Sequence, residues 1–354
     1  MKIKQLQKSF KKNKIDFGLL INLEMEANPN FYYLTHYNGI GALITSKKQP
    51  PFLIVPKMEY QRAKKSIIKR IYKLEKKKFF ETIKETAKKR KLKTKIIGID
   101  KNNFTLSLYK NFKKQFKGKI KDISLDCQKL REVKTEKEVE YLKKSCSYAS
   151  NILKKTIKNF KNFKTESEVA AYLEYEAKKL GLQLSFPPVV ASGTNASMPH
   201  HEPKNIKLKK GFCVIDFGIK HNGYCSDITR TIYLGKPNEK EKEIYNFLLK
   251  TQKNIIENIK INNNCGEIYN NCVKSLKQYS KYFTHGLGHG VGTNIHELPN
   301  LSLNSKDRIQ KNMVFTIEPG IYIKNKLGIR IEDTILMKTK PIILTKAPKG
   351  LLTI

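Results

Sequence analysis

The sequence predicts two domains of mixed class, an α/β unit over residues 1–126 and an α+β unit over residues 135–354. Three observations lead there. The chain has 354 residues, more than one compact core usually holds, since domains commonly have ~100–200 residues. In the first part, short apolar runs alternate with lysine-rich stretches. In the second part, capped amphipathic helices alternate with strand-like stretches, which indicates a sheet and helices packed together.

The first unit is expected to hold a sheet covered by helices. Its candidate strands are the apolar runs FGLLI, GALIT, PFLIVP and KIIGID, and the lysine-rich stretches between them suit helices. No constellation of acids, bases or metal ligands stands out in this part. We therefore interpret it as a packing or oligomerisation domain.

The second unit is expected to begin with a long helix. Three helix starts share the capping-box spacing, a Thr or Asn followed three residues later by Glu: Thr135 with Glu138, Thr165 with Glu168, and Asn238 with Glu241. Gly181 follows the second of these helices as an expected carboxyl-terminal cap. The strand-like stretches between and after the helices are FCVIDFGIK, GYCSDITRTIYLG, NMVFTIEPGIYI and GIRIEDTILM.

The charge balance is strongly basic. Lysine and arginine number 70 against 31 aspartates and glutamates, a formal charge of +39, which would normally suggest nucleic acid or an anionic surface as a partner. The lysines are spread through almost every segment, however, without an arginine-rich tail, an aromatic RNA-binding signature or zinc-finger spacing. We predict no specific nucleic-acid partner, and nonspecific polyanion binding stays open.

The cysteines and the apolar runs indicate a compartment. Six cysteines form no C-x-x-C pair and the amino terminus resembles no export signal, which predicts a reducing cytoplasm and no disulfide scaffold. No stretch reaches the ~18 continuous apolar residues of a membrane span, so no membrane partner is expected.

Two aspartates are predicted to converge across a hairpin. The Asn222-Gly223 pair is a strong two-residue turn signal. With that turn, Asp216 faces Thr229 and Gly218 faces Asp227, so both carboxylates project from one side with Cα atoms ~7–8 Å apart. Acids in apolar strands need a counter-charge. Exposure to solvent beside lysines is an equally good explanation of the hairpin taken alone.

Two further acids favour a functional site. Glu318 stands at a strand end, because apolar residues lead into it and Pro319-Gly320 follows. Glu332 shares a strand face with Arg330 by period-two alternation. A salt bridge between these two residues is a structural alternative for Glu332, and it explains Glu318 less well.

The segment FTHGLGHGVGTNIHELP supplies histidines to this group of acids. Its glycines permit tight turns and close backbone approach, so the imidazoles of His285, His289 and His296 can point inward. One histidine with four carboxylates is an oxygen-rich ligand set that suits two divalent ions such as manganese or cobalt. Such a pair can activate a water and polarise a carbonyl for amide hydrolysis, and the other histidines can assist as acids or hydrogen-bond donors.

With these motifs in order, the sequence resembles the pita-bread metallopeptidases, and within them the Xaa-Pro dipeptidases (prolidases) and Xaa-Pro aminopeptidases. The resemblance rests on SGTNASMPHHEP, VIDFGIKHNGYCSDITRTIYLG, HGLGHGVGTNIHE, FTIEPGIYI and GIRIEDTILM. It covers the whole second domain. The run NPNFYYLTHYNGIGALIT resembles the creatinase/prolidase-like amino-terminal domain of the same proteins.

The resemblance implies a dinuclear metal site, with two divalent ions per subunit. Manganese is the first expectation, with cobalt or zinc as alternatives. The implied ligands are Asp216, Asp227, His289, Glu318 and Glu332. Asp227 and Glu332 would bridge the ions, and Glu318 would also take the proton of the bridging water.

The resemblance also implies roles for the residues around the metals. His200 and His296 would contact the scissile carbonyl and the intermediate, while His285 and Arg330 would surround the site and help to bind substrate. His201 is expected to be a surface neighbour of His200. His221 is expected to be a turn residue.

The implied function is that of a cytoplasmic, homodimeric metallopeptidase that hydrolyses the Xaa-Pro bond of dipeptides. A bridging hydroxide on the dinuclear site would attack the peptide. An Xaa-Pro aminopeptidase acting on longer proline-containing peptides is the alternative within the class. From a different class, the alternative is a catalytically idle module whose positive charge attaches it to nucleic acid.

Overall fold

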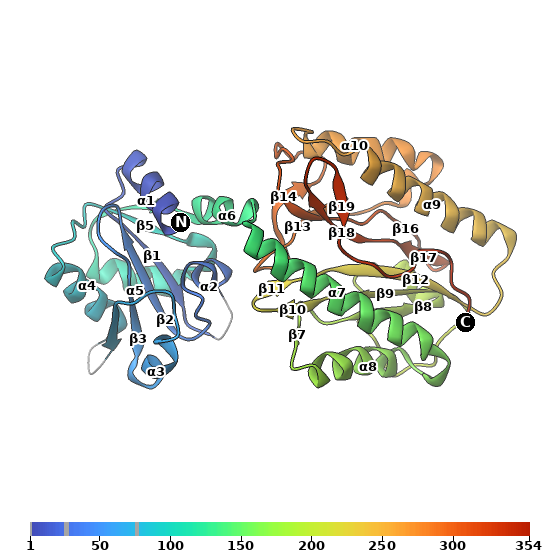
Figure 1. Ribbon diagram of the computed structural model, residues 1–354, viewed down its shortest axis with the longest axis horizontal. Helices are drawn as coiled ribbons and strands as arrows, with labels where there is room; N and C mark the ends of the chain where they lie inside the picture. The colour runs from blue at the N-terminus through green and yellow to red at the C-terminus, as the bar shows by residue number, and fades with distance from the viewer. Residues whose placement is uncertain (1, 25–27, 75–77) are drawn as a thin grey trace. The chain divides into compact units, whose positions relative to one another are not determined.

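The computed structural model describes residues 2–24, 28–74 and 78–354 (Figure 1). The chain divides into two compact units, one ending at Arg131 and the other beginning at Glu132. Helix α6 (Ser124–Glu132) therefore occupies the stretch between the two predicted domains. In the part of the chain that is described, no helix is both long and apolar enough to cross a membrane.

The amino-terminal unit is built on a six-stranded sheet in the order β4-β3-β2-β1-β5-β6. Its strands are β1 (Phe17–Asn22), β2 (Gly41–Ser46), β3 (Phe52–Pro56), β4 (Ile71–Leu74), β5 (Ile96–Ile99) and β6 (Lys119–Asp122). The central strands are the four apolar runs that the sequence picks out. Both edge strands contain lysines, and the sequence analysis missed them.

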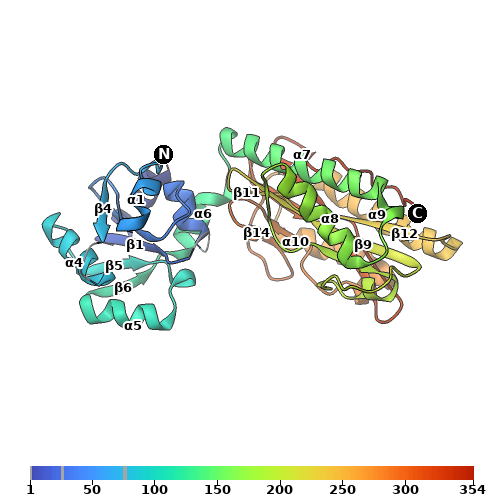
Figure 2. The same cartoon turned by 90° about the horizontal axis from the view of Figure 1, so that it is seen from below.

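Helices cover both faces of this sheet, as the predicted α/β class requires. They are α1 (Lys2–Lys12), α2 (Pro29–Thr35), α3 (Tyr60–Ala63), α4 (Phe79–Lys89), α5 (Leu106–Gln115) and α6. Phe10 of α1 and Cys127 of α6 belong to the apolar core on one face. Phe80 of α4 and Phe112 of α5 belong to the core on the other, and Figure 2 shows the sheet between α1 and α5.

The second unit contains several small antiparallel sheets. Their orders are β12-β9-β8, β11-β10-β7, β14-β13-β15-β18-β19 and β16-β17. The strands of the first two sheets are β7 (Gln183–Leu184), β8 (Val189–Ser192), β9 (Gly211–Phe217), β10 (Ile219–His221), β11 (Tyr224–Cys225) and β12 (Ile228–Leu234). The remaining strands are β13 (Gly288–Gly290), β14 (Glu297–Leu301), β15 (Val314–Ile317), β16 (Gly320–Ile323), β17 (Leu327–Arg330), β18 (Asp333–Met337) and β19 (Pro341–Ile343).

Two pairs of helices back these sheets, which confirms the predicted α+β class. The helices are α7 (Glu136–Lys158), α8 (Glu166–Lys179), α9 (Glu239–Asn258) and α10 (Cys265–Ser275). Apolar residues of α7 and α8 pack with β8, β9 and β12 in one core. Those of α9 and α10 pack with β15, β17 and β18 in another. Figure 1 shows α8 and the α9–α10 pair on opposite sides of the strands.

The predicted hairpin has the predicted register. His221 pairs with Tyr224 across the turn, and Asp216 pairs with Thr229 further along. Asn222 has a φ of 49° and Gly223 a φ of 78°, as a two-residue turn of this type requires. His221 lies at the strand end directly before the turn.

The helix starts follow the sequence closely. Complete capping boxes begin α7 at Thr135 and α9 at Asn238. At α8 the Thr165 hydroxyl accepts from the Glu168 N–H, but the Glu168 carboxylate accepts from Lys164 instead of the cap residue. That box is therefore half formed.

Candidate metal centre

Breaks in the strands bring the predicted acids to one place. Glu318 follows the end of β15, where Pro319 prevents the ladder from continuing. Glu332 lies in the gap between β17 and β18. Asp227 lies between β11 and β12, and His289 is the middle residue of β13. Each side chain therefore comes from a different part of the sheets.

A cavity of about 440 Å³ is lined by all nine residues that were predicted to bind metal or substrate or to take part in catalysis. It is lined by Asp216, Asp227, His289, Glu318 and Glu332, and also by His200, His285, His296 and Arg330. An apolar wall of Phe186, Pro187, Pro188, Val189, Pro199 and Ile295 faces the same space. A lining that combines a few polar groups with apolar surface is typical of a small-molecule site.

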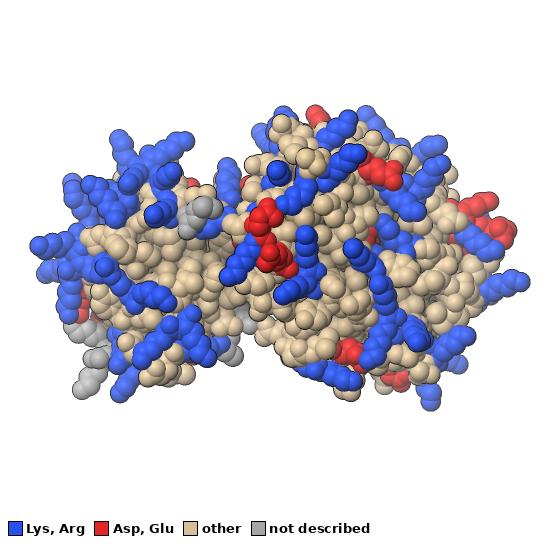
Figure 3. Space-filling model, viewed as in Figure 1, with Lys and Arg blue, Asp and Glu red and all other residues tan. Residues whose placement is uncertain are grey.

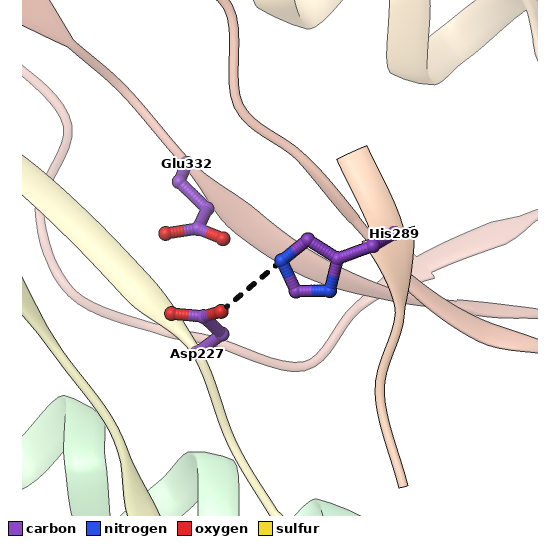
Figure 4. Close-up of side chains that lie close together, drawn as sticks. All are labelled: Asp227, His289 and Glu332. Atoms are coloured by element: carbon purple, nitrogen blue, oxygen red, sulfur yellow. Dashed lines mark ion pairs between the residues drawn. The ribbon is translucent and has the colours of Figure 1, made fainter. Parts of the chain in front are cut away.

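Three of these residues form the tightest group. Asp227, His289 and Glu332 each offer one ligand atom, and these atoms lie within 4.8 Å of one another (Figure 4). The Nε2 atom of His289 is 3.5 Å from Asp227 Oδ2 and 3.5 Å from Glu318 Oε1. His289 Nδ1 donates to the Gly290 carbonyl at 3.1 Å, so the lone pair of Nε2 points toward the acids.

Burial disfavours the ionised form of the acids in this group. Burial and the neighbouring carboxylates raise the pKa of Asp227 and Glu332 well above the usual values. Burial likewise raises the pKa of Glu318 to about 8. Burial lowers the pKa of His289 to about 4, so its imidazole is neutral at pH 7. Arg330 is the one cation among the described residues that line this cavity, and it does not outweigh the burial of these acids, so a bound cation would favour their ionised forms.

Unpartnered oxygens test whether these residues fit a cation. Among the described residues, Asp216 Oδ1, Asp227 Oδ1 and Glu332 Oε1 are buried without a hydrogen-bond partner. The second oxygen of Asp216 accepts from Arg330 at 2.7 Å, and that of Glu332 accepts from Thr229 at 2.8 Å. Buried acceptors without a donor are costly. One held and one open oxygen per carboxylate is the arrangement of oriented metal ligands, so the residues fit divalent cations.

Arg330 is held by hydrogen bonds to residues around this site, which together form its frame. Its guanidinium donates to Asp216, Thr229, Tyr322 and the carbonyl of Pro199. The ion pair that the structure gives it is with Asp216, in place of the one with Glu332 that the sequence left open. Four of its five N–H donors are thereby engaged. Thr229 and Tyr322, which the sequence analysis did not single out, complete this frame.

The histidines around the ligands differ in how firmly they are held. His285 donates from Nδ1 to the Gly286 carbonyl at 2.7 Å and accepts from the Tyr322 hydroxyl at 3.0 Å. The imidazole of His296 packs edge-on against that of His289, with ring centroids 4.3 Å apart. His200 is an exposed residue at the wall of the cavity.

The expectation for His201 was wrong. Its side chain is buried and its Nε2 lies 2.7 Å from the carboxylate of Glu166, which is also buried. The two residues are 35 positions apart, and in the sequence Glu166 stands out only as an acid in the first turn of a helix. No local spacing could have joined them.

Comparisons with known proteins agree with this geometry. The family model of metallopeptidase family M24 matches residues 140–339, and the family model of the creatinase/prolidase N-terminal domain matches residues 2–133. The Xaa-Pro dipeptidase of Pyrococcus furiosus is 36% identical over 347 residues, covering 95% of this chain and 94% of the relative. That of Pyrococcus horikoshii is 35% identical over 345 residues, with the same coverage.

Solved structures show the same fold over the whole chain. An Xaa-Pro dipeptidase from Bacillus anthracis superposes with a TM-score of 0.92 at 30% identity, covering 100% of this chain and 99% of that one. An X-Pro aminopeptidase from Thermotoga maritima gives 0.89 at 29% identity, covering 98% and 100%. The chain is thus a peptidase with the pita-bread fold, and it belongs to metallopeptidase family M24.

Proposed function

We propose that this protein is a metal-dependent Xaa-Pro dipeptidase. The observation that carries the proposal is the group of buried, partly unpartnered carboxylates around His289, which line a cavity together with apolar residues. The similarity to two Xaa-Pro dipeptidases over 95% of the chain supports the choice of substrate. A homodimer in the cytoplasm is part of the same proposal.

The proposed ligands of two divalent ions are Asp216, Asp227, His289, Glu318 and Glu332. Asp227 and Glu332 are the bridging candidates that the resemblance implies, and with His289 they form the tightest group of possible ligand atoms, within 4.8 Å of one another. Oxygen ligands with one imidazole suit manganese first, with cobalt or zinc as alternatives. When bound, such ions would lower the pKa of a bound water toward neutrality and polarise the scissile carbonyl.

The protein's own groups supply the proton transfers and the orientation. Glu318 lies at a strand end, with its Oε1 3.5 Å from His289 Nε2. A bound cation would favour its ionised form, and its carboxylate would then be placed to accept the proton of the attacking water. His200 and His296 line the cavity and would donate to the carbonyl oxygen as negative charge develops on it. His285 and Arg330 hold the surrounding frame and keep Asp216 in orientation.

The apolar wall fits the proline ring. Phe186, Pro187 and Pro188 line the same cavity as the charged ligands, and burial of a ring against them would contribute about 25 cal/mol per Å². A ring packed there would also keep water from the reacting bond, which would strengthen the charge interactions nearby.

Hydrolysis by metal-stripped protein tests the proposal. Cleavage of Met-Pro should return when manganese or cobalt is added, should be lost in Asp227→Asn, and should persist in Glu176→Gln. Glu176 is a matched control, because its carboxylate is paired with Lys155 at 2.7 Å on a helix away from the cavity. Failure of all three metals (manganese, cobalt and zinc) to restore cleavage would refute the proposal.

A second candidate is an Xaa-Pro aminopeptidase. The likeness to the X-Pro aminopeptidase from Thermotoga maritima over 98% of the chain favours it. A tetrapeptide of the form Xaa-Pro-Yaa-Yaa separates the two activities. Cleavage of the tetrapeptide but not of Met-Pro would establish the aminopeptidase in place of the dipeptidase.

A further inference from the structure

The segment that carries His200 has two adjacent histidines with opposite surroundings. His200 is exposed at the cavity wall, whereas His201 is only 6% exposed. The chain turns at His200, and the turn is closed by a hydrogen bond from the His201 N–H to the Met198 carbonyl at 3.2 Å. The position of His200 therefore depends on what holds its buried neighbour.

Glu166 holds that neighbour and both ends of the same segment. Its Oε2 lies 2.7 Å from His201 Nε2 and accepts from the Lys204 N–H at 3.4 Å. Its Oε1 accepts from the Ser192 N–H at 2.8 Å, the Ser192 hydroxyl at 2.9 Å and the Asn195 amide at 3.0 Å. One carboxylate thus collects five contacts, and all of them come from residues 192–204.

The backbone of α8 extends this attachment. The Ser167 N–H donates to the Lys204 carbonyl at 3.1 Å, and the Glu166 N–H donates to the Ile206 carbonyl at 3.3 Å. The segment is therefore fastened to the first turn of α8 by its side chains and by its main chain.

A second attachment lies on the other side of His200. The carbonyl of Pro199 accepts from Arg330, whose guanidinium also holds Asp216. His200 consequently lies between a neighbour fixed to the metal frame and a neighbour fixed to α8. Few backbone torsions remain free between these two points.

We propose that Glu166 is a positioning residue for catalysis, which acts through His201 and the ends of the 192–204 segment to place His200 against the scissile carbonyl. This inference rests on the proposed Xaa-Pro peptidase activity and adds to it a residue that touches neither metal nor substrate. Hydrogen bonds from Asn195, Ser192 and His201 outweigh burial and lower the pKa of Glu166, so the carboxylate is ionised and accepts from every donor around it.

A double-mutant cycle tests the coupling. Glu166→Gln replaces one acceptor oxygen by an amide that opposes its donors, and a misplacement of ~1 Å at a reacting group can cost about 100-fold in rate. We expect kcat/KM for Met-Pro to fall by roughly 10- to 100-fold, mainly in kcat. The same substitution should change little further when His200→Ala is already present. Additive losses would overturn the proposal.

The control is Glu176→Gln, which removes a nearly buried carboxylate from the same helix without touching the segment. It should keep wild-type kcat and KM. Metal content is measured in every variant, and Glu166→Gln should retain the metal of the wild type. A loss of metal in that variant would overturn the inference, because the effect would then run through the ligands.

A second pair of variants guards against misfolding of Glu166→Gln. His201→Gln keeps an N–H donor for Glu166, whereas His201→Leu removes it. The glutamine variant should retain most of the wild-type kcat and the leucine variant should not. Equal kcat in the two variants would overturn the inference.

Amide hydrogen exchange separates this inference from the proposed function. Glu166→Gln should speed exchange at Ser192 and Lys204, whose N–H groups donate to Glu166, and Glu176→Gln should not. If the wild-type protein cleaves no Xaa-Pro peptide, the proposed function fails while the exchange data still decide on the attachment. Unchanged exchange in Glu166→Gln would overturn it.

Discussion

Adjacent acids at the junction of β17 and β18 have opposite environments. Asp333 accepts from Arg230 at 2.8 Å and Lys349 at 2.7 Å, and these cations outweigh burial and lower its pKa. The carboxylate of Glu332 accepts one hydrogen bond among the described residues, from the Thr229 hydroxyl, and burial raises its pKa. Asp333 takes part in structural ion pairs and Glu332 is a proposed ligand, although the sequence Glu332-Asp333 does not distinguish the two roles.

This contrast predicts opposite effects of two neighbouring substitutions on the metal-free protein. Asp333→Asn leaves Arg230 buried beside a neutral group and should lower the free energy of unfolding by about 3–5 kcal/mol. Glu332→Gln removes a repelling carboxyl group and should leave that free energy unchanged or slightly raised. Urea unfolding in the presence of a chelator measures both. Equal destabilisation by the two variants would contradict the assignment.

The sequence predicted which side chains line the cavity better than it predicted their hydrogen-bond partners. Asp216, Asp227 and Glu318 could be found because turn and strand-end signals are local. The attachment of His201 to Glu166 could not, since it depends on tertiary contact between a loop and a helix start. The partner of Arg330 was also undetermined, because period-two alternation gives the strand face but not the neighbour across the sheet.

Among the elements, the hairpin and the helix ends were the most predictable. A two-residue turn fixes the register of the strands on both sides, so the pairing of Asp216 with Thr229 followed from Asn222-Gly223. The edge strands β4 and β6 were missed, because lysines interrupt their apolar residues. Lysine on a sheet edge discourages pairing with other chains. The lysines that made these strands hard to predict therefore protect the edges of the sheet.

At the carboxyl-terminal cap of α8, the cost of backbone strain can be measured without a steric contribution from neighbouring atoms. Gly181 has a φ of 68° and donates to the Lys178 carbonyl, while Leu182 donates to Ala177, which together form a Schellman motif. Nothing lies within 4 Å of an added Cβ at Gly181 or at Gly350. Gly181→Ala should therefore cost about 1 kcal/mol through its torsion alone.

Gly350→Ala is the matched control, because Gly350 also faces open space and has no positive φ. It should leave the free energy of unfolding unchanged, and Gly181→Asn should cost less than Gly181→Ala, since Asn tolerates the left-handed region better. Urea unfolding followed by circular dichroism measures all three variants. An equal effect at both glycines would show that torsion is not the cause.

Asp16 joins three strands of the amino-terminal sheet. It precedes β1, accepts from the Ile96 N–H at 3.0 Å beside β5, and pairs with Lys47 after β2 at 2.9 Å. Burial opposes its ionisation, but these donors outweigh it and lower its pKa below 3.8. Because the folded pKa is the lower one, Asp16 stabilises the fold above the unfolded pKa, and this contribution fades as the pH falls through the folded value.

Asp16→Asn should therefore destabilise the amino-terminal unit by about 1 kcal/mol at pH 7. The difference from the wild type should shrink as the pH is lowered past 3.8. Amide exchange of β1, compared between the two proteins at each pH, measures this difference. A difference that grows toward low pH would contradict the sign of the shift.

On the scale of the whole molecule, the proposed metal site depends on the tertiary fold. Its five proposed ligands are spread from residue 216 to residue 332 and lie on or between eight strands of the second unit. Sequence order and residue type indicated which side chains take part. Their convergence on one cavity required the layers of sheet and helix, which local patterns do not specify.

The charge of the molecule is the other property at this scale. Only 31 acids accompany 70 lysines and arginines, so most cations have no acid to pair with. Figure 3 shows them distributed over the visible face of both units rather than gathered in one patch. Such a distribution fits no particular ligand. It does imply that the positive side chains within each folded unit repel one another, because folding brings like charges closer than they are in an unfolded chain.

Salt should consequently stabilise this protein. Raising NaCl from 10 to 300 mM shortens the screening length from ~30 Å to below ~10 Å. Relief of about 1 kcal/mol of repulsion would raise the Tm by roughly 2–4 °C. The measurement is thermal unfolding of the metal-free protein over this range, with sucrose at equal osmolality as a control for solvent exclusion. A Tm that falls with salt would mean that the ion pairs around Asp16, Glu176 and Asp333 outweigh the excess of lysine, and that the positive charge is balanced locally after all.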